Sequence, residues 1–203
     1  MNPNSDNNFL NLCFITPNLM YHEALQYLRK GDTILYLSDT TWVLGCDARN
    51  EKAVEKLLLL KQLPENKQLT ILISKIEQLS EYVLEVPELA WNLVEFAEKP
   101  LTVIYPKGKN LPSNLMGKDG SIAIRLVKDE FCKGLVHKFE RAIVSTSANI
   151  SGQPSPLKFE DISLEIVNGV DYILKNPKGE NKNTQPSQII KLGLDFGFEF
   201  IRK

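Results

Sequence analysis

The sequence predicts an α/β fold in which helices flank a twisted mixed sheet. Short apolar runs of strand length recur along the chain, and several segments between them carry apolar residues at helical spacing. Strands and helices do not alternate in the strict order that a purely parallel sheet requires, which indicates a mixed sheet. The length of 203 residues suffices for one sizeable core and favours one domain over two.

The N-terminal part of the chain predicts a flexible segment followed by a helix. Residues 1–14 are expected to form a flexible N-terminus that could include an edge strand over residues 7–14. The folded domain is expected to span residues 15–203. From Pro17 onwards, apolar residues at helical spacing predict a helix that ends at Lys30 and Gly31, which are typical of a helix C-terminus.

Two strands and a capped helix are expected next. The apolar run 33–36 predicts a strand that leads into a polar loop. Asn50 is expected to cap a helix from Glu51 to about Lys61, whose buried side is apolar. Residues 62–67 break this helix, and the run 69–73 predicts a buried strand.

The remaining elements are predicted from the same two periodicities. Helices are expected over 76–82, 88–98, 131–139 and 160–168. Strands are expected over 101–105, 121–127, the apolar run 142–144, 170–174, 187–192 and 198–202. A flexible loop over 176–186, rich in Lys, Asn and Gly, separates two of these late strands.

Composition and charge favour a globular protein of the cytoplasm. Hydrophobic residues make up 43% of the chain and charged residues 24%, which is ordinary for globular proteins. The net charge of −1 provides no global positive field that would attract nucleic acid, so any RNA contact has to be local. No apolar stretch is long enough to span a membrane, and the start of the chain lacks the features of a secretory signal.

The cysteine and histidine residues do not indicate a metal centre. Cys13, Cys46 and Cys132 are odd in number and widely separated, which is typical of reduced thiols. His22 and His137 are the only histidines, and neither belongs to a metal-binding motif. We therefore expect neither a structural nor a catalytic zinc.

The most informative segment is the polar run 145–152, Ser-Thr-Ser-Ala-Asn-Ile-Ser-Gly, which directly follows an apolar strand. A strand that ends in small polar residues presents backbone N–H groups and short side-chain donors, so the run could wrap an anion. An ordinary turn rich in serine and asparagine is the alternative. A second polar strand end, Ser-Asp-Thr-Thr at 38–41, follows the strand 33–36. Two polar strand ends in one small domain indicate one shared site.

Arg125 interrupts the otherwise apolar run 121–127. Burying an unpaired guanidinium group is prohibitively unfavourable. Arg125 therefore either forms an internal salt bridge or points into a site that holds an anion.

Three segments, in this order and spacing, resemble the YrdC-like threonylcarbamoyl-AMP synthase family. They are SDTTWVLGCDARNEKAVEKLLLLK at 38–61, DGSIAIRLV at 119–127 and IVSTSANISGQPSP at 143–156. The resemblance implies a single-domain YrdC-like sheet with a concave ligand-binding surface. The sequence Lys-Gln-Leu-Pro at 61–64 also resembles that of a YciO-like side branch of the family. Because the chain has neither a Walker A nor a GxGxxG motif, ATP binding is implied by the resemblance and by local chemistry alone.

Members of that family join L-threonine, bicarbonate and ATP into threonylcarbamoyl-AMP and pyrophosphate, for the threonylcarbamoyl modification of adenosine in tRNA. The resemblance thus implies an ATP-dependent nucleotidyltransferase in which Lys61 is catalytic. It implies ATP contacts by Lys61, Ser121, Ser147, Asn149, Ser155 and Arg202. It implies threonine contacts by Ser38, Thr40, Arg125, Ser145 and Ser187.

The local chemistry is compatible with these roles. Arg125 could hold the threonine carboxylate in two parallel hydrogen bonds. Carboxylation of the amine and attack on the α-phosphate need mainly positioning and charge neutralisation, so no catalytic His or Cys is required. Lys61 and Mg²⁺, the cofactor expected with ATP, would offset the phosphate charge. Structural roles are the alternatives: Lys61 as a solvated helix end, Arg125 as an ion pair and Asn149 as a turn former.

Two positions depart from the family pattern. The family's lysine-x-arginine motif is Lys61-Gln62-Leu63 here, so its arginine is missing, and Lys67 is the first candidate to replace the charge. A missing charge at an ATP site removes transition-state stabilisation unless another group compensates. The usual tyrosine-glycine pair is Trp42-Val43, which removes a residue that adopts positive φ freely.

Two other function classes are open. A weakly catalytic or non-catalytic protein could use the concave surface to bind double-stranded RNA or tRNA, and Lys107, Lys109 and Lys118 permit a local basic patch. A small-metabolite binding domain is the other class. A synthase would have ATP, L-threonine, bicarbonate and downstream tRNA threonylcarbamoyl-transfer proteins as partners, and no membrane.

Overall fold

The computed structural model describes residues 17–64, 68–176, 186–193 and 197–203. The expected flexible N-terminus at 1–14, with its edge strand, and most of the loop 176–186 lie outside these residues. The helices are α1 (Pro17–Lys30), α2 (Glu51–Lys61), α3 (Leu79–Tyr82), α4 (Glu88–Phe96), α5 (Glu130–Phe139) and α6 (Leu164–Gly169). Three short 3-10 helices are η1 (Ile76–Gln78), η2 (Ser113–Leu115) and η3 (Phe159–Asp161).

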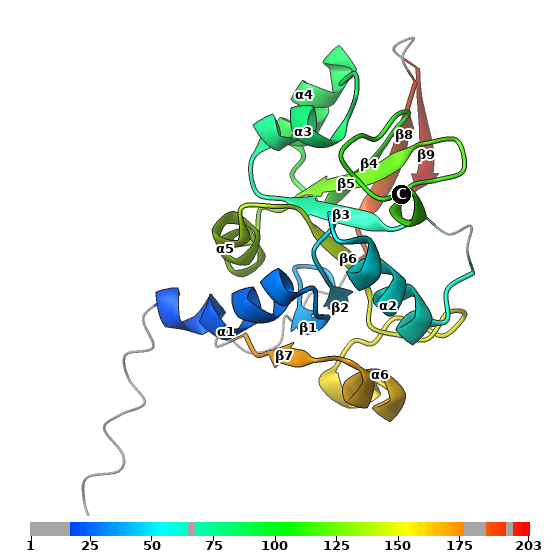
Figure 1. The fold of residues 1–203 in the computed structure, drawn as a ribbon. Coiled ribbons are helices and arrows are strands. Elements are labelled where there is room, and N and C mark those ends of the chain that lie inside the picture. Colours follow the sequence, from blue (N-terminus) through cyan, green and yellow to red (C-terminus); the bar gives the residue numbers. More distant parts are fainter. Residues whose placement is uncertain (1–16, 65–67, 177–185, 194–196) are drawn as a thin grey trace, which may run out of the picture.

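The strands of the described residues form one twisted sheet (Figure 1). They are β1 (Ile34–Leu37), β2 (Trp42–Gly45), β3 (Thr70–Ile73), β4 (Leu101–Tyr105), β5 (Ile122–Leu126), β6 (Ile143–Ser147), β7 (Tyr172–Leu174), β8 (Gln188–Leu192) and β9 (Phe198–Arg202). Their order across the sheet is β7-β1-β2-β6-β3-β5-β4-β8-β9. The pairs β1·β7, β3·β5 and β4·β8 are parallel and the other pairs are antiparallel, which confirms the predicted mixed sheet.

Helices cover both faces of the sheet, and each face has its own apolar core. Because successive strand residues point to opposite faces, neighbours in the sequence belong to different cores. Tyr36 and Leu72 pack in the core that α1 and α5 cover. Leu35 and Ile71 pack in the other core, together with residues of α2, α3 and α4. The central strands are therefore covered on both faces over their apolar stretches, whereas β9 at the edge of the sheet is exposed.

The helix α2 has the predicted boundaries. The side chain of Asn50 accepts a hydrogen bond from the backbone N–H of Ala53 at 3.2 Å, as expected of an N-cap. The helix ends at Gln62, which adopts a left-handed conformation with a φ of 52°. This end places Lys61 on the last helical turn.

Of two further predicted helical segments, one has the expected extent and the other is divided. The segment 76–82 is helical throughout, because η1 runs directly into α3, and the side chain of Gln78 caps the start of η1 by accepting hydrogen bonds from the backbone N–H groups of Ser74 and Lys75. The prediction of one helix over 160–168 is wrong, because Ser163 is extended and caps α6, which separates it from η3. A local side-chain cap thus starts a new helix inside this second segment.

Residues 42–45, predicted as part of a loop, form the strand β2. The backbone N–H of Ser38 donates to the carbonyl of Thr41 at 2.9 Å and closes a tight turn between β1 and β2. β2 is buried between β1 and β6, so both of its edges are paired. The polar strand end at 38–41 is therefore the tip of a hairpin.

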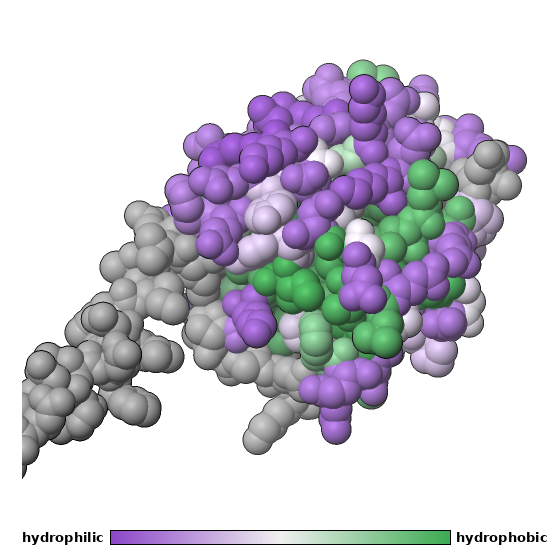
Figure 2. Space-filling model, turned by 60° about the horizontal axis from the view of Figure 1, so that its bottom comes forward, coloured by the Kyte–Doolittle hydropathy of each residue, from purple (hydrophilic) through white to green (hydrophobic). Residues whose placement is uncertain are grey.

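Part of the surface is apolar at the end where α6 and β7 lie. Figure 2 brings that end forward and shows hydrophobic residues gathered within a hydrophilic surround. Leu164, on α6, is 75% exposed. None of the helices in the described ranges is long and apolar enough to cross a membrane.

Candidate functional site

A row of mostly polar side chains crosses one face of the sheet. The strand registers pair Ser145 with Thr70, Arg125 with Thr102, and Ile189 with both Thr102 and Arg202. Residues paired across neighbouring strands lie on the same face of a sheet. Side chains from distant parts of the chain therefore meet on this face.

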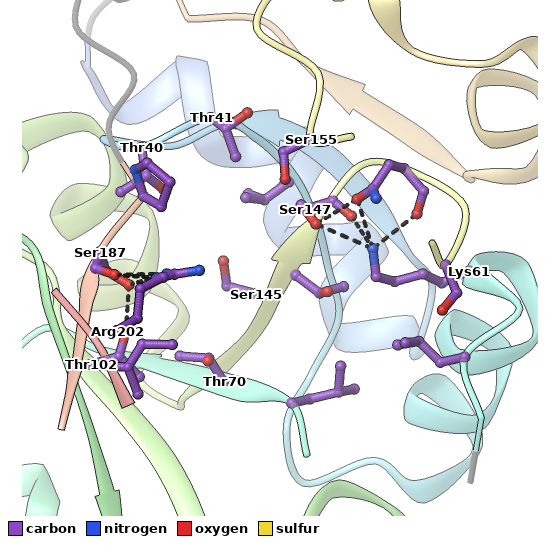
Figure 3. A pocket seen from close by; sticks show the side chains of 18 of the residues that line it. Thr40, Thr41, Lys61, Thr70, Thr102, Ser145, Ser147, Ser155, Ser187 and Arg202 are labelled. Carbon is purple, nitrogen blue, oxygen red and sulfur yellow. Dashed lines mark hydrogen bonds between the residues drawn. The ribbon is translucent and has the colours of Figure 1, made fainter. Parts of the chain in front are cut away.

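These side chains line a cavity of about 470 Å³, which is the size of a small-molecule site. The lining includes the predicted site residues Thr40, Lys61, Arg125, Ser145, Ser147, Asn149, Ser155, Ser187 and Arg202. Figure 3 shows Ser187, Arg202 and Thr102 on one side, Lys61 and Ser147 on the other, and Ser145 between them. Lys61, Arg125, Ser147 and Asn149 thus converge on one cavity, as a shared site requires.

Lys61 joins the end of α2 to the polar run after β6. Its Nζ donates to the backbone carbonyls of Ser147 at 2.5 Å and Asn149 at 2.9 Å, and to Asn149 Oδ1 at 3.0 Å. Ser147 Oγ lies 3.3 Å from the same Nζ. The side chain is 4% exposed, so Lys61 is not the solvated helix end of the alternative interpretation.

Asn149 shapes the turn and contacts the lysine at the same time. Its Nδ2 donates to the carbonyls of Ile150 at 3.2 Å and Gln153 at 2.5 Å, while its Oδ1 accepts from Lys61. Gly152 completes the turn with a φ of 87°, which favours glycine. The turn-forming role and the role in the site are therefore compatible.

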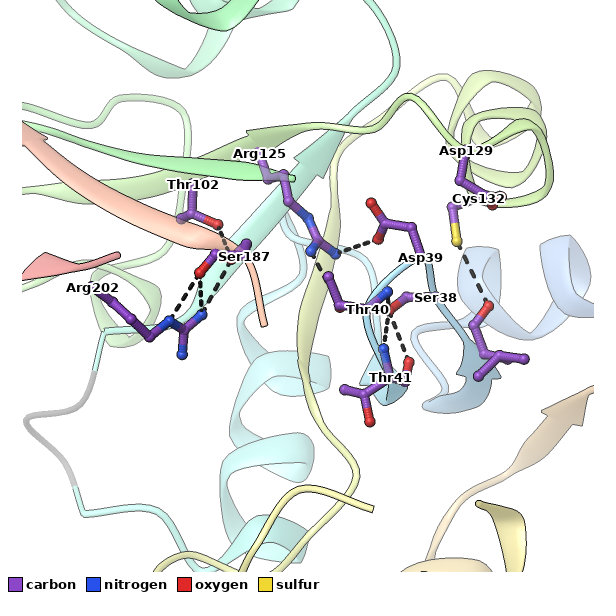
Figure 4. Close-up of polar contacts among 11 residues, drawn as sticks. Ser38, Asp39, Thr40, Thr41, Thr102, Arg125, Asp129, Cys132, Ser187 and Arg202 are labelled. Atoms are coloured by element: carbon purple, nitrogen blue, oxygen red, sulfur yellow. Dashed lines mark hydrogen bonds and ion pairs between the residues drawn. The ribbon is translucent and has the colours of Figure 1, made fainter. Parts of the chain in front are cut away.

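Arg125 forms an ion pair and also lines the cavity (Figure 4). Its Nη2 lies 3.2 Å from Asp39 Oδ1, and its Nη1 donates to Thr40 Oγ1 at 3.3 Å. Its Nε is buried and has no hydrogen-bond partner among the described residues. Both alternatives for Arg125 thus hold together, and one buried donor is left for a ligand.

Arg202 adds a second guanidinium group to the same side of the cavity. Its Nε and Nη2 donate to the carbonyl of Ser187 at 2.9 and 2.7 Å, and Ser187 Oγ lies 2.9 Å from Thr102 Oγ1. Burial, and then the charge of Arg125, lower the pKa of Arg202. The positive charges of Arg125 and Arg202 repel each other, so an anionic ligand between them would be stabilising.

Two residues implied by the resemblance are not in the cavity lining. Ser38 is buried behind the hairpin tip, where its Oγ lies 2.9 Å from Thr40 Oγ1 and donates to the Thr41 carbonyl at 2.8 Å. Ser121 Oγ donates to Asp119 Oδ1 at 2.5 Å and accepts from Gln68 at 3.2 Å. Among the described residues, the hydroxyls of both serines form hydrogen bonds that stabilise the neighbouring loops.

Several lining residues were missed by the sequence analysis. They include Gln68, Thr70, Thr102 and Gln153, whereas Thr41, Thr146 and Ser151 belong to the two polar runs that the sequence analysis singled out. Thr70 and Thr102 each interrupt an apolar strand, as Arg125 does. The criterion that singled out Arg125 could therefore have found both threonines.

The two departures from the family pattern have different outcomes. Leu63 is half-buried and lines the cavity, so an arginine at this position would reach it. Val43 lies inside β2 and is not among the residues with positive φ, so this position does not use the conformational freedom that a glycine would give. Lys67, the candidate replacement for the missing arginine, lies outside the described residues.

Among the residues that the structure describes, the cavity lining contains no aspartate or glutamate. Across the described ranges, no group of three or more His, Cys, Asp or Glu side chains could hold a metal ion. These residues therefore do not fit a resident magnesium centre, because Mg²⁺ prefers carboxylate oxygens in proteins.

Comparison with known proteins gave a family match and several relatives. The Sua5/YciO/YrdC family model, described as "Telomere recombination", matches residues 26–203. A threonylcarbamoyl-AMP synthase of Pseudoalteromonas translucida is 34% identical over 169 residues, which cover 82% of this chain and 89% of that protein. A second threonylcarbamoyl-AMP synthase, from Acinetobacter baumannii, is 31% identical over 83% of this chain and 91% of that protein.

Two solved structures share the fold. Sua5 of P. abyssi, in complex with L-threonine, has a TM-score of 0.79 at 29% identity and is matched over 88% of this chain. This chain spans 52% of that Sua5 chain, which is about half its length. YciO of E. coli has a TM-score of 0.78 at 26% identity, with 93% of this chain and 90% of that chain covered.

Proposed function

Because the chain belongs to the Sua5/YciO/YrdC family, we propose that it is an L-threonylcarbamoyladenylate synthase. The reaction joins L-threonine, bicarbonate and ATP into threonylcarbamoyl-AMP and pyrophosphate. The observation that carries this proposal is the convergence of Lys61, Arg125 and Arg202 on one hydroxyl-rich cavity. Such a cavity suits a ligand with several anionic groups and hydroxyls.

The two sides of the cavity suggest two subsites. Arg125 and Arg202, with the hydroxyls of Ser145 and Ser187, are suited to the carboxylate and the side chain of L-threonine. The unpartnered Nε of Arg125 is one donor for that carboxylate. Arg202 was assigned to ATP by the family resemblance, and its position beside Ser187 favours threonine instead.

The opposite side of the cavity is suited to phosphate groups. Lys61 Nζ is held by Ser147 and Asn149 at the end of α2, so its positive charge is fixed in place. The backbone N–H groups of the turn after β6 are close to it, since the N–H of Ser151 donates to the Lys61 carbonyl at 3.0 Å. Because Lys61 is already in position, its positive charge can stabilise the negative charge that develops on the phosphate without any reorganisation.

The proposed chemistry depends on positioning. The threonine amine attacks the carbon of bicarbonate, a C–O bond breaks and water leaves, which gives a carbamate. A carbamate oxygen then attacks the α-phosphorus of ATP while pyrophosphate leaves. Holding the carboxylate at one side and the phosphates at the other brings these atoms together. The cavity lining has neither a histidine nor a cysteine, and the proposed steps require neither.

Mg²⁺ enters this proposal only as the ion that ATP brings with it. Its ligands would be phosphate oxygens and water, as is common for magnesium at nucleotide sites. The product would serve the threonylcarbamoyl modification of adenosine in tRNA, with downstream transfer proteins as partners. Direct RNA binding and the cytoplasmic location stay predictions.

A pyrophosphate-release assay with ATP, Mg²⁺ and bicarbonate, with and without L-threonine, tests the proposal. We expect release that depends on threonine and that Lys61→Met abolishes without unfolding the protein. Lys56→Met is the matched control, because Lys56 pairs with Asp171 outside the cavity. Release that is independent of threonine, or no release by folded protein, would reject the synthase function.

A further inference from the structure

Tyr36 is a buried titratable residue next to the cavity. The proposed reaction does not use this residue. It lies on β1, where the strand register pairs it with Val43 of β2, a cavity-lining residue. The side chain is 0% exposed and packs in the core that α1 and α5 cover. Tyr36 therefore shares a face of the sheet with the cavity.

Gly45 allows the Tyr36 ring to extend across β2 toward β6. A Cβ atom at Gly45 would lie 2.8 Å from Tyr36 Cε1 and 2.9 Å from the carbonyl oxygen of Val144, closer than packed atoms come. The register that pairs Val43 with Ser147 and Leu44 with Thr146 continues to place Gly45 across from Ser145. The ring therefore extends past Gly45 toward Ser145 on the neighbouring strand β6.

The hydroxyl of Tyr36 has no hydrogen-bond partner of ordinary geometry in the described part of the chain. Burying a hydroxyl without a partner is unfavourable, and a phenylalanine would avoid that cost. The fold alone therefore gives no reason for a tyrosine at this position.

The surroundings indicate what the hydroxyl can contact. Burial, and then the Cys132 thiol, raise the pKa of Tyr36, while the Ser145 hydroxyl acts in the opposite direction. The phenol consequently stays protonated, so its O–H is a hydrogen-bond donor. Ser145 is the neighbour that both faces the cavity and can accept this proton.

We propose that Tyr36 is a positioning residue, whose hydroxyl donates to Ser145 Oγ when a ligand occupies the cavity. Once Ser145 Oγ accepts this bond, its own proton is directed away from Tyr36 and toward the ligand. Hydrogen bonds in such a chain strengthen one another in a dry environment. The proposal rests on the proposed function in one respect, namely that L-threonine is the ligand beside Ser145.

The experiment compares Tyr36→Phe with Tyr105→Phe. Tyr105 of β4 is also 0% exposed with an unpartnered hydroxyl, and it lies in the opposite core, outside the cavity lining. Each variant loses one buried hydroxyl without changing the ring. Calorimetric titration with L-threonine, with and without a non-hydrolysable ATP analogue, gives the affinity, and a thermal melt gives the stability of the free protein.

We expect opposite effects on binding and on stability. Tyr36→Phe should weaken threonine binding roughly three- to tenfold, as the loss of one hydrogen bond does, while its melting temperature stays equal or rises. Tyr105→Phe should keep the affinity of the wild type, again with an equal or higher melting temperature. In a Ser145→Ala background, Tyr36→Phe should cost no further affinity, because its partner is already absent.

Four results would overturn the inference. An unchanged affinity of Tyr36→Phe, with a wild type that binds threonine, rejects the inference and leaves the proposed function standing. A lowered melting temperature together with weaker binding assigns the hydroxyl to the fold. An additive loss in the Ser145→Ala background rules out the route through Ser145. A wild type that binds no threonine under either condition rejects the proposed function and, with it, this inference.

Discussion

Arg125 of β5 and Asp39 of the hairpin tip form an ion pair in which Nη2 and Oδ1 are 3.2 Å apart. The two side chains are only 5% and 16% exposed, so each charge is stabilised mainly by its partner instead of by water. The pair ties the centre of the sheet to the loop between β1 and β2. It also holds the guanidinium at the cavity wall.

Removing Arg125 should therefore affect both stability and binding. We expect Arg125→Ala to lose threonine binding and to lower the free energy of unfolding by about 3 kcal/mol, because the Asp39 carboxylate loses its partner. Urea unfolding and calorimetric titration measure the two effects. The double variant Asp39→Asn/Arg125→Gln should recover much of the stability and none of the binding. A single variant as stable as the wild type would contradict this account of the ion pair.

Leu63 tests whether the missing family arginine limits ATP use. Leu63 lines the cavity near Lys61, so Leu63→Arg adds a positive charge where phosphates are proposed to bind. We expect faster pyrophosphate release in the presence of L-threonine. Leu59→Arg is the matched control, because Leu59 lies on α2, which ends just before Leu63, and is 72% exposed outside the cavity. Equal rates for both variants would show that charge at position 63 does not matter.

The two proposed subsites predict different kinetic defects. Arg202→Ala should raise the KM for L-threonine more than the KM for ATP, since Arg202 lies beside Ser187 and Arg125. Lys61→Met should show the reverse preference, or no measurable turnover. Lys203→Ala is the control for loss of a neighbouring charge, because Lys203 is not in the lining. Equal changes in both KM values for Arg202→Ala would argue against separate subsites.

Asp119 provides a test of what Ser121 does. The Ser121 hydroxyl and then its backbone N–H lower the pKa of Asp119 to about 2, from an ordinary value of 3.8. A folded-state pKa below the unfolded one stabilises the protein at pH values above the unfolded pKa, and this contribution is lost as the pH falls toward 2.

We expect Ser121→Ala to move the Asp119 pKa back toward 3.8, so that the contribution to stability becomes smaller and its loss is complete at a higher pH. An NMR titration of the Asp119 carboxyl group measures this directly. Lys191→Met should give a smaller shift, since Lys191 contributes less to the lowered pKa. If Ser121→Ala leaves the pKa unchanged while it weakens ATP binding, then Ser121 serves the ligand, as the family resemblance implies.

Local patterns in the sequence were enough to predict most elements and part of the site. Asn50 and the apolar side of the following helix define α2, because capping and amphipathic spacing act within a few residues. A polar residue inside an apolar strand identified Arg125, and the same criterion covers Thr70 and Thr102. The strand β2 was missed although β1 and β3 are equally short, and what defines it in the structure is its pairing with β1 and β6.

Which side chains meet in the cavity was decided by the tertiary structure. Strict alternation along β9 would place Phe198, Phe200 and Arg202 on one face of the sheet. The register shifts between Ile189 and Ile190, so that Ile189 pairs with Arg202 while Ile190 pairs with Phe200. Because Ile189 and Ile190 point to opposite faces, this irregularity turns Arg202 to the cavity face and leaves Phe200 on the other.

The contrast has a physical reason. Capping, helical spacing and strand alternation depend on neighbours in the chain, so the sequence by itself determined the elements and the polar strand ends. Strand order and register depend on contacts between segments such as β5, β6 and β9, which are far apart in the sequence. Only the folded sheet could therefore place Arg125 against Asp39, Lys61 against Asn149, and Tyr36 beneath Ser145.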